Sequence, residues 1–299
     1  MPETAAATGA ARHMSPLDWV RWLTPGVVWG TSFYFIAEGL EAFPAALITP
    51  MRIAFGFLTL ALVPAARAAR IDRVDWRRLA LLGVIWMAVP LSIFPFAEQT
   101  VSSSVVGMLN GATPIFVTTV AAGIARRMPG TRQLAGIALG FAGVALIALP
   151  AGTGESSWGG VALIIGALVF YGFALNVAVP LQQRYGALAT MWRVQGVAFL
   201  LTAPFAITSA DDIATDSPRL WPAFAALVGL GVLGTALAYV MMADNAGRLG
   251  STRASASVYL IPVVSLLLGA LVRHEHVDAL SIAGCAVALV GAYVATSSR

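Results

Sequence analysis

The chain repeats itself, and each copy holds an odd number of apolar spans. The pattern Ala-Leu-x-Thr-x-x-Arg at 46–52 recurs at 187–193, and Leu-Gly-Val at 82–84 recurs at 230–232. Because a membrane helix needs roughly 20 apolar residues, the chain has room for about ten spans, five in each copy. Two five-span copies must face opposite ways across a bilayer. This inverted duplication is typical of secondary transporters that expose one central site alternately to each side.

The composition excludes a soluble globular protein. Hydrophobic residues make up 59% of the chain, charged residues only 11%, and the mean hydropathy is +0.82, values typical of a membrane protein. Cys285 is the only cysteine, so neither a disulfide framework nor a thiolate metal cluster is possible within the chain. We expect no cofactor and no metal, and membrane topology explains the net charge of +4 without nucleic acid.

The sequence predicts an all-α polytopic membrane protein with ten transmembrane helices arranged as two inverted five-helix repeats. Residues 1–18 are expected to form a cytoplasmic tail rather than a cleaved signal peptide. The first repeat would then cover 19–150 and the second 151–299. The ten predicted spans are 20–38, 44–65, 78–98, 102–125, 132–150, 158–180, 188–208, 221–246, 252–272 and 278–296.

Charge counts in alternate loops test this division, since cytoplasmic loops carry the excess of basic residues. Outside the spans, one side of the membrane would hold nearly all of the arginines, including the run from Arg67 to Arg78. The other side keeps only Arg219 and Arg273 and most of the acidic residues. We therefore expect both termini in the cytoplasm of a bacterial inner membrane.

The motifs of the spans resemble those of a known family. Trp29 and Gly30 are followed by Ser32 and Phe33 in the first span, and prolines lie at matching places in the fourth and ninth. In this the chain resembles the EamA branch of the drug/metabolite transporter (DMT) superfamily, and within it the YddG-type exporters of aromatic amino acids. The resemblance implies a central cavity lined mainly by helices one, three, four, six, eight and nine, with helices five and ten at the periphery.

Prolines inside the spans indicate where backbone carbonyls are freed, because proline removes one helical hydrogen bond. Pro114 would free the carbonyl of Asn110, and Pro262 would free that of Val258. Pro90 and Pro95 form a second such element in the third span. These kinks either shape helix packing or bring polar groups to a substrate; the polar candidates beside them are Asn110, Ser257 and Tyr259.

Aromatic side chains at interior depths are candidates for contact with an aromatic ligand, since they combine flat apolar area with polar tips. Anchoring at the membrane interface or ordinary core packing is the alternative for each of them. These aromatic candidates are Trp29, Phe33, Tyr34, Trp86, Phe94, Tyr171, Tyr239 and Tyr259. Asn176 is a further polar candidate.

Arg52 and Arg193 occupy equivalent places in the two copies and lie inside spans. An arginine at the bilayer centre costs at least about 2.5 to 3.5 kcal/mol, so each must face protein or water, or reach the interface. Arg193 is close enough to the end of its span for its side chain to reach the membrane interface. Arg52 could attract a substrate carboxylate or brace its helix against neighbouring carbonyls, and structural support is the favoured alternative.

We expect a secondary transporter that exports amino acids, aromatic ones foremost, by alternating access. The spans contain no histidine and no mid-span acid, which favours a facilitator or exchanger over a proton antiporter and argues against a membrane-embedded enzyme. A DMT carrier of another metabolite or drug and a passive channel stay as alternatives. The partners expected are a small-molecule substrate and the lipid bilayer, and the protein is a monomer or a homodimer.

Overall fold

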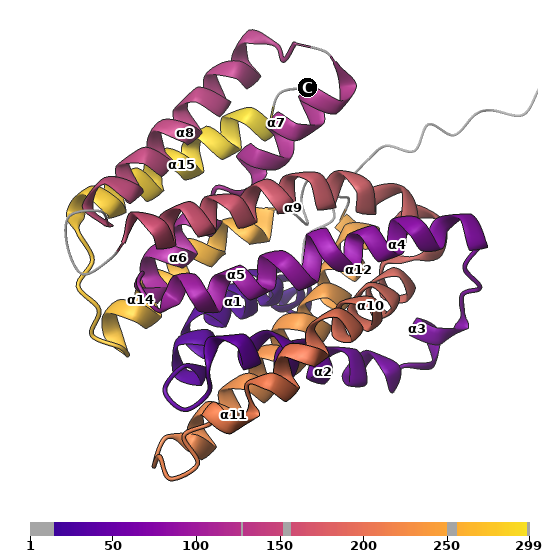
Figure 1. Cartoon of the computed structure of the whole chain (residues 1–299). Helices are drawn as coiled ribbons and strands as arrows, with labels where there is room; N and C mark the ends of the chain where they lie inside the picture. Colours follow the sequence, from indigo (N-terminus) through magenta and orange to yellow (C-terminus); the bar gives the residue numbers. More distant parts are fainter. Residues whose placement is uncertain (1–14, 127, 152–156, 250–255, 298–299) are drawn as a thin grey trace, which may run out of the picture.

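A computed structural model shows the protein as a bundle of helices (Figure 1). The structure describes residues 15–126, 128–151, 157–249 and 256–297, and no strand occurs within these ranges. The first 14 residues of the predicted tail lie outside them. The elements of the first half are α1 (Pro16–Gly39), α2 (Ala45–Ala61), α3 (Pro64–Ala68), η1 (Arg73–Asp75), α4 (Trp76–Leu82), η2 (Gly83–Ala88), α5 (Val89–Glu98), α6 (Ser103–Asn110), α7 (Thr113–Ala125) and α8 (Thr131–Ala151).

The second half repeats this order. Its elements are α9 (Trp158–Tyr185), α10 (Ala187–Thr208), η3 (Ala210–Asp212), α11 (Leu220–Gly229), η4 (Leu230–Leu237), α12 (Ala238–Leu249), η5 (Ala256–Leu260), α14 (Ile261–Leu271) and α15 (Ala279–Thr296). The described helices lie within a few residues of the predicted spans, except that α9 continues five residues beyond its predicted end. Two buried apolar clusters hold the bundle together.

Six helical stretches are long and apolar enough to cross a membrane by length and composition. They are Arg73–Glu98, Ser103–Ala125, Thr131–Pro150, Trp158–Tyr185, Leu220–Met242 and Ala279–Thr296. Ala45–Ala61 and Ser257–Leu271 are shorter apolar helices. The protein is therefore an all-α polytopic membrane protein, as predicted. The total of ten crossings, which also needs α1 and α10, stays a prediction.

Four of the predicted spans are not continuous α-helix. The third and eighth contain π-helical turns, η2 and η4, which begin at the matching positions Gly83 and Leu230 to within one residue of the repeat. The fourth breaks at Gly111 and Ala112, and the ninth begins as the 3₁₀ turn η5. Pro114 and Pro262 lie in the first turn of the helix after the break. There a proline has no helical hydrogen bond to lose.

Contacts between the two halves come in reciprocal pairs. In the first half α2 packs against η4, and its counterpart α10 packs against η2. Similarly, α1 packs against η5 and α14, whereas α9 packs against α6 and α7. This is the packing expected of two related halves that interlock around a common axis.

Helices α8 and α15 form a separate antiparallel pair beside the main bundle (Figure 1). A Cβ atom on Gly136 would lie 2.4 Å from the backbone nitrogen of Ala295, and one on Gly143 would lie 2.3 Å from that of Ala288. Small residues permit this close approach of two backbones. Gly136 and Gly143 of α8 thus pack directly against α15 of the same chain.

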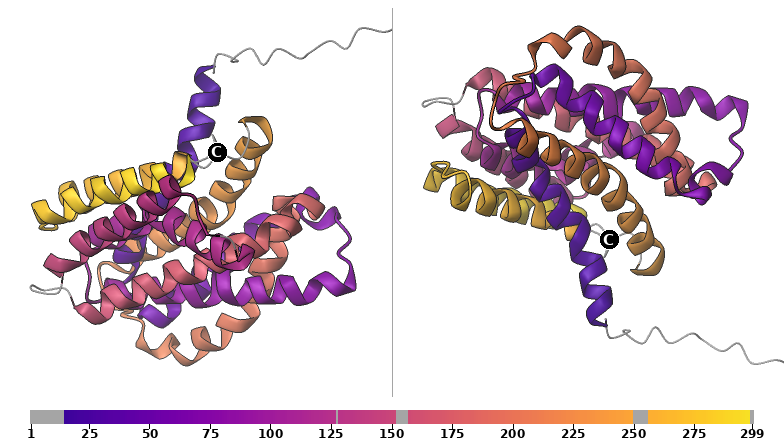
Figure 2. Two further views of the ribbon diagram at one scale, coloured as in Figure 1. Left: turned by 90° about the horizontal axis from the view of Figure 1, so that it is seen from above. Right: turned by 90° about the horizontal axis from the view of Figure 1, so that it is seen from below.

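The bundle has two ends that matter for the site. The terminal face is the end where α1 begins and α15 finishes. There the first turns of α1 project beside α12 (Figure 2). Asn245 of α12 donates a 2.8 Å hydrogen bond to the carbonyl of Arg21 of α1. The distal face is the opposite end, where Gly39, Ser103 and Leu271 mark helix boundaries.

Candidate functional site

The cavity at the centre of the bundle has a volume of about 460 Å³, within the usual range of small-molecule sites. Of the predicted binding and kink residues it brings together Trp29, Phe33, Trp86, Phe94, Asn110, Pro114, Tyr171, Tyr239 and Tyr259. Arg52 also lines it, so helix two contributes to the cavity in addition to the helices that the family resemblance implied.

Aromatic rings form two connected groups on the cavity wall. Tyr239 makes edge contacts with Trp29 and Trp86, with ring centroids 5.2 and 5.7 Å apart. Phe94 contacts Phe33 at 5.7 Å and Tyr171 at 6.0 Å. Edge-to-face and tilted arrangements at these distances are the favoured geometry of aromatic pairs. The wall is thus mostly flat, apolar surface with a few polar tips.

The breaks in the helices expose backbone groups that polar side chains satisfy. The hydroxyl of Thr113 donates to the carbonyl of Asn110, next to the break, at 2.6 Å, so that carbonyl is already paired. The indole of Trp29 donates to the carbonyl of Gly234 within η4 at 2.9 Å. Irregular backbone is tolerated at membrane depth where such partners exist, and π-helical turns are frequent at functional sites.

Several predicted residues lie outside the cavity lining. The ring of Tyr34 packs against Phe35, and the amide of Asn176 donates to the carbonyls of Val117 and Gly172 at 3.1 and 2.8 Å. Ser257 is fully buried behind the wall. Pro90, Pro95, Pro262 and Arg193 are also absent from the lining residues.

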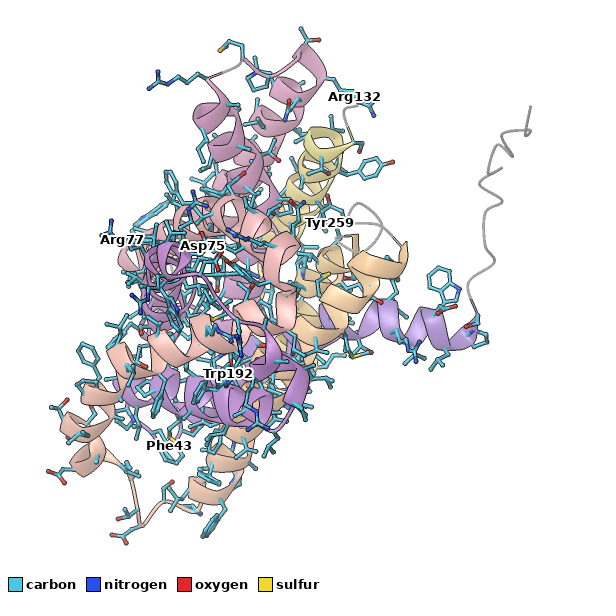
Figure 3. The ribbon with its side chains drawn as sticks, turned by 90° about the vertical axis from the view of Figure 1, so that its right-hand side faces the viewer. Phe43, Asp75, Arg77, Arg132, Trp192 and Tyr259 are labelled. Atoms are coloured by element: carbon cyan, nitrogen blue, oxygen red, sulfur yellow. The ribbon has the colours of Figure 1, made fainter. Side chains whose placement is uncertain are left out.

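The cavity extends to the terminal face. Gln182 of α9, Ala187 of α10 and Thr296 of α15 line it there. The hydroxyls of Tyr259 and Thr296 are 3.0 Å apart, and Figure 3 shows Tyr259 where η5 approaches α15. The lining residues therefore run from mid-bundle to this end.

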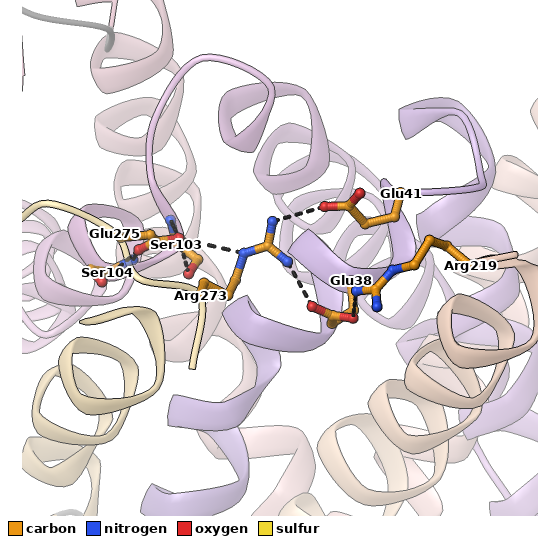
Figure 4. Close-up of polar contacts among 7 residues, drawn as sticks. All are labelled: Glu38, Glu41, Ser103, Ser104, Arg219, Arg273 and Glu275. Atoms are coloured by element: carbon orange, nitrogen blue, oxygen red, sulfur yellow. Dashed lines mark hydrogen bonds and ion pairs between the residues drawn. The ribbon is translucent and has the colours of Figure 1, made fainter. Parts of the chain in front are cut away.

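Charged residues form a network across the distal face, which we call the distal latch: Glu38, Glu41, Arg219, Arg273 and Glu275 (Figure 4). Arg273 binds Glu38 at 2.7 Å, Glu41 at 3.0 Å and Glu275 at 3.7 Å, and Arg219 binds Glu38 at 2.7 Å. These contacts join the end of α1 to the segments that follow α14 and precede α11. Partial burial lowers the pKa of Arg273, but the hydrogen bond to Glu41 and the surrounding carboxylates outweigh it and raise that pKa above its ordinary value.

Glu275 also ties the latch to the fourth span. Its carboxylate accepts hydrogen bonds from the backbone and hydroxyl groups of Ser103 and Ser104, at 2.6 to 3.1 Å. These residues begin α6, where free N–H groups and the helix dipole favour a negative charge. The latch therefore connects α1, α6 and the loop after α14 at one end of the cavity.

Sequence reasoning missed the latch pairs and the polar partners within η4. The signal for the latch was present, because Arg219 and Arg273 were the only arginines on an otherwise acidic side. The π-helical turn had no such signal. The described residues contain no group of three or more His, Cys, Asp or Glu that could hold a metal ion.

Comparisons with known proteins agree with this geometry. The sequence profile of the EamA-like transporter family matches residues 21–149 and 158–297. A protein of Streptantibioticus cattleyicolor described as a "Probable terminal-alkyne amino-acid exporter" is 27% identical over 286 residues, covering 93% of this chain and 92% of that protein. The "Uncharacterized inner membrane transporter YedA" of Escherichia coli is 24% identical over 253 residues, covering 81% of this chain and 78% of YedA.

A solved crystal structure shares the fold, with a TM-score of 0.59 at 20% sequence identity, covering 93% of this chain and 95% of the other. The family match spans both halves of the sequence and nearly all of the described helices. The chain belongs to the EamA-like transporter family.

Proposed function

We propose that the protein exports amino acids, aromatic ones foremost, across a bacterial inner membrane by alternating access, with both termini in the cytoplasm. The observation that carries the proposal is the aromatic cavity in mid-bundle, which reaches the terminal face while the distal latch spans the other end. Its volume suits one molecule of amino-acid size. A relative described as an amino-acid exporter supports the substrate class.

The arrangement corresponds to a carrier open toward the cytoplasm and closed toward the outside. Export would then require the latch to open while the terminal ends of α9, α10 and α15 close over Gln182 and Thr296. The matching π-helical turns η2 and η4 interrupt the regular α-helix once in each half, and bending would occur there. Rocking of one half against the other around a fixed site is the usual mechanism in inverted-repeat carriers.

The driving force in this proposal is the substrate's own gradient, used by a facilitator or an exchanger. Glu98 favours a second candidate, in which a proton is exchanged for substrate. Both of its carboxylate oxygens are buried at the end of α5 and have no hydrogen-bond partner among the described residues. A buried acid of this kind inside a membrane protein is often a proton carrier. Dependence of uptake on an imposed pH gradient separates the two.

The experiment is an uptake panel with purified protein in liposomes. Tryptophan, phenylalanine and tyrosine are compared with small neutral and charged amino acids, nucleosides and cationic drugs. Saturable uptake of the three aromatic amino acids, with competition among them, is the expected result. If the protein ignores all three but carries another class, it is a DMT carrier of that class instead. Linear, unselective flux would indicate a passive channel.

A further inference from the structure

We propose that Arg52 is the residue that binds the carboxylate of the transported molecule. The proposal deepens the function proposed above and rests on it. It follows from a difference between two arginines that occupy the same place in the two halves of the chain, Arg52 and Arg193.

The guanidinium of Arg193 forms its hydrogen bonds with the protein itself. It donates to the carbonyls of Ala66 and Ala189 at 3.0 and 2.9 Å, and also to the carbonyl of Ala69. These contacts fasten the chain segment around α3 to α10. Arg193 therefore has a structural role, and its side chain is not among those that line the cavity.

The guanidinium of Arg52 is held differently. Its Nε donates to the hydroxyl of Thr235 at 2.8 Å, and that hydroxyl donates in turn to the carbonyl of Leu230 at 3.1 Å. Because the Thr235 proton is used for Leu230, its oxygen is oriented to accept from Arg52. This chain fixes the guanidinium by one edge. Within the part of the chain that the structure describes, no hydrogen bond or ion pair is recorded for its two Nη groups.

Arg52 is also deeply placed, since it is only 6% exposed and lines the cavity. A buried cation in a membrane protein is unfavourable unless an anion or strong acceptors compensate it. The two Nη groups of an arginine match the two oxygens of a carboxylate in a bidentate pair. An anionic substrate group would therefore complete the coordination that Thr235 begins.

The surroundings of Arg52 specify the rest of the ligand. Its Nη2 lies 3.8 Å from the position a Cβ on Gly234 would take, and the carbonyl of Gly234 accepts from Trp29. Trp29 in turn contacts the ring of Tyr239, which contacts Trp86. A carboxylate on Arg52 would thus place an attached flat apolar group against these rings. The same positive charge would disfavour cationic drugs and simple amines.

The first test changes the ligand and leaves the protein intact. Purified wild-type protein in liposomes is assayed for uptake of labelled tryptophan in the presence of unlabelled indole-3-propionate, tryptophanamide or tryptamine. Only the first of these retains a carboxylate. We expect indole-3-propionate to compete at least about tenfold better than either amine, as the loss of a charged hydrogen-bonded pair implies. Equal competition by all three compounds would overturn the proposal.

The second test changes the protein. Arg52→Gln should raise the half-saturation concentration for tryptophan about ten- to a hundredfold and remove the preference for indole-3-propionate over tryptamine. Arg52→Lys, which keeps the charge, should retain that preference. Arg193→Gln is the matched control, and its preference should equal that of the wild type whatever its yield. A purely structural Arg52 would lower the amount of active protein without changing the preference.

The two proposals can fail separately. Aromatic amino acids carried with no influence of the carboxylate or of Arg52 would leave the proposed function standing and overturn the role of Arg52. Non-aromatic carboxylates, tested in the same assay as labelled pyruvate and alanine, could instead be carried in an Arg52-dependent way while the aromatic amino acids are not. That result would support the anchor and overturn the aromatic specificity. Failure of every carboxylate to move would overturn both.

Discussion

The side chains on the cavity wall differ in what they contribute. Trp86 and Tyr239 touch one another on the wall, whereas Tyr34 was an equal candidate in the sequence but packs outside it against Phe35. The residue type does not distinguish these cases. What differs is the side of its helix on which each residue lies. Trp29 and Phe33 turn toward the cavity, and Tyr34, one residue further, turns away.

Trp86→Ala should therefore weaken transport of tryptophan. An aromatic pair contributes about 0.5 to 1.5 kcal/mol of binding free energy in addition to the burial of its apolar area. The substitution would lose both contributions. We expect a roughly tenfold rise in the half-saturation concentration, measured by initial uptake into proteoliposomes. Tyr34→Ala is the control and should stay within about twofold. Equal effects of the two substitutions would show that the cavity wall does not contact the substrate.

At the scale of elements, the α8–α15 pair depends on glycine at the points of closest approach. Gly143→Ala places a Cβ 2.3 Å from the backbone of Ala288, so one of the two helices must move. Overpacking of this kind costs about 1 to 3 kcal/mol. We expect a clearly lower melting temperature of the detergent-solubilised protein. Gly166→Ala, whose Cβ would meet nothing within 4 Å, should melt close to the wild type or above it, and a reversed order would refute the close packing.

The distal latch makes a second prediction at this scale. Arg273→Gln removes the cation that joins Glu38, Glu41 and Glu275, so the distal end should open more often. In a Cys285→Ala background, a cysteine in place of the cavity residue Leu91 should react severalfold faster with an impermeant thiol reagent applied from the distal side. Arg78→Gln is the control, because the exposed side chain of Arg78 pairs with Asp75 away from the latch. Unchanged labelling in Arg273→Gln would exclude a gating role.

The pH dependence of the latch follows from the sign of the Arg273 shift. A cation whose pKa is raised on folding contributes stability that is fully present below the unfolded pKa and is lost only as pH rises through the folded value. For Arg273 that window lies above the ordinary pKa of an arginine side chain, far above the physiological range. Titration of Arg273 should therefore not change the rate at which the cysteine at position 91 is labelled between pH 6 and pH 9. The rate is corrected for the effect of pH on the thiol reagent itself.

The order of helices could be predicted from the sequence, whereas their internal breaks could not. Apolar runs and arginine-rich loops located the spans, because lipid demands long helices and the charge bias is strong. The π-helical turns at Gly83 and Leu230 carry no comparable composition signal. They determine which carbonyls are free, so Trp29 and Gly234 could not be paired in advance. The prolines predicted kinks, but Pro114 begins a helix after a break instead.

For the whole molecule, the duplicated sequence predicts that the ends of the chain share one side of the membrane. Thr296 of α15 contacts Tyr259 of η5 at the terminal face, and η5 packs against Gly26 of α1. If the carboxyl end is cytoplasmic, a fluorescent protein fused to it should fluoresce. Alkaline phosphatase fused to the same end should be inactive. An active phosphatase fusion would place that end in the periplasm and rule out two inverted five-helix halves.

The measurement that tests the central claim most directly is counterflow of tryptophan. Liposomes containing the purified protein are loaded with unlabelled tryptophan, diluted into a trace of labelled tryptophan at equal pH, and followed with time. A carrier with one alternately exposed cavity should accumulate label transiently, in a saturable way and without a pH gradient. Flux that rises linearly with concentration and never overshoots, or that appears only when a pH gradient is imposed, would contradict the account.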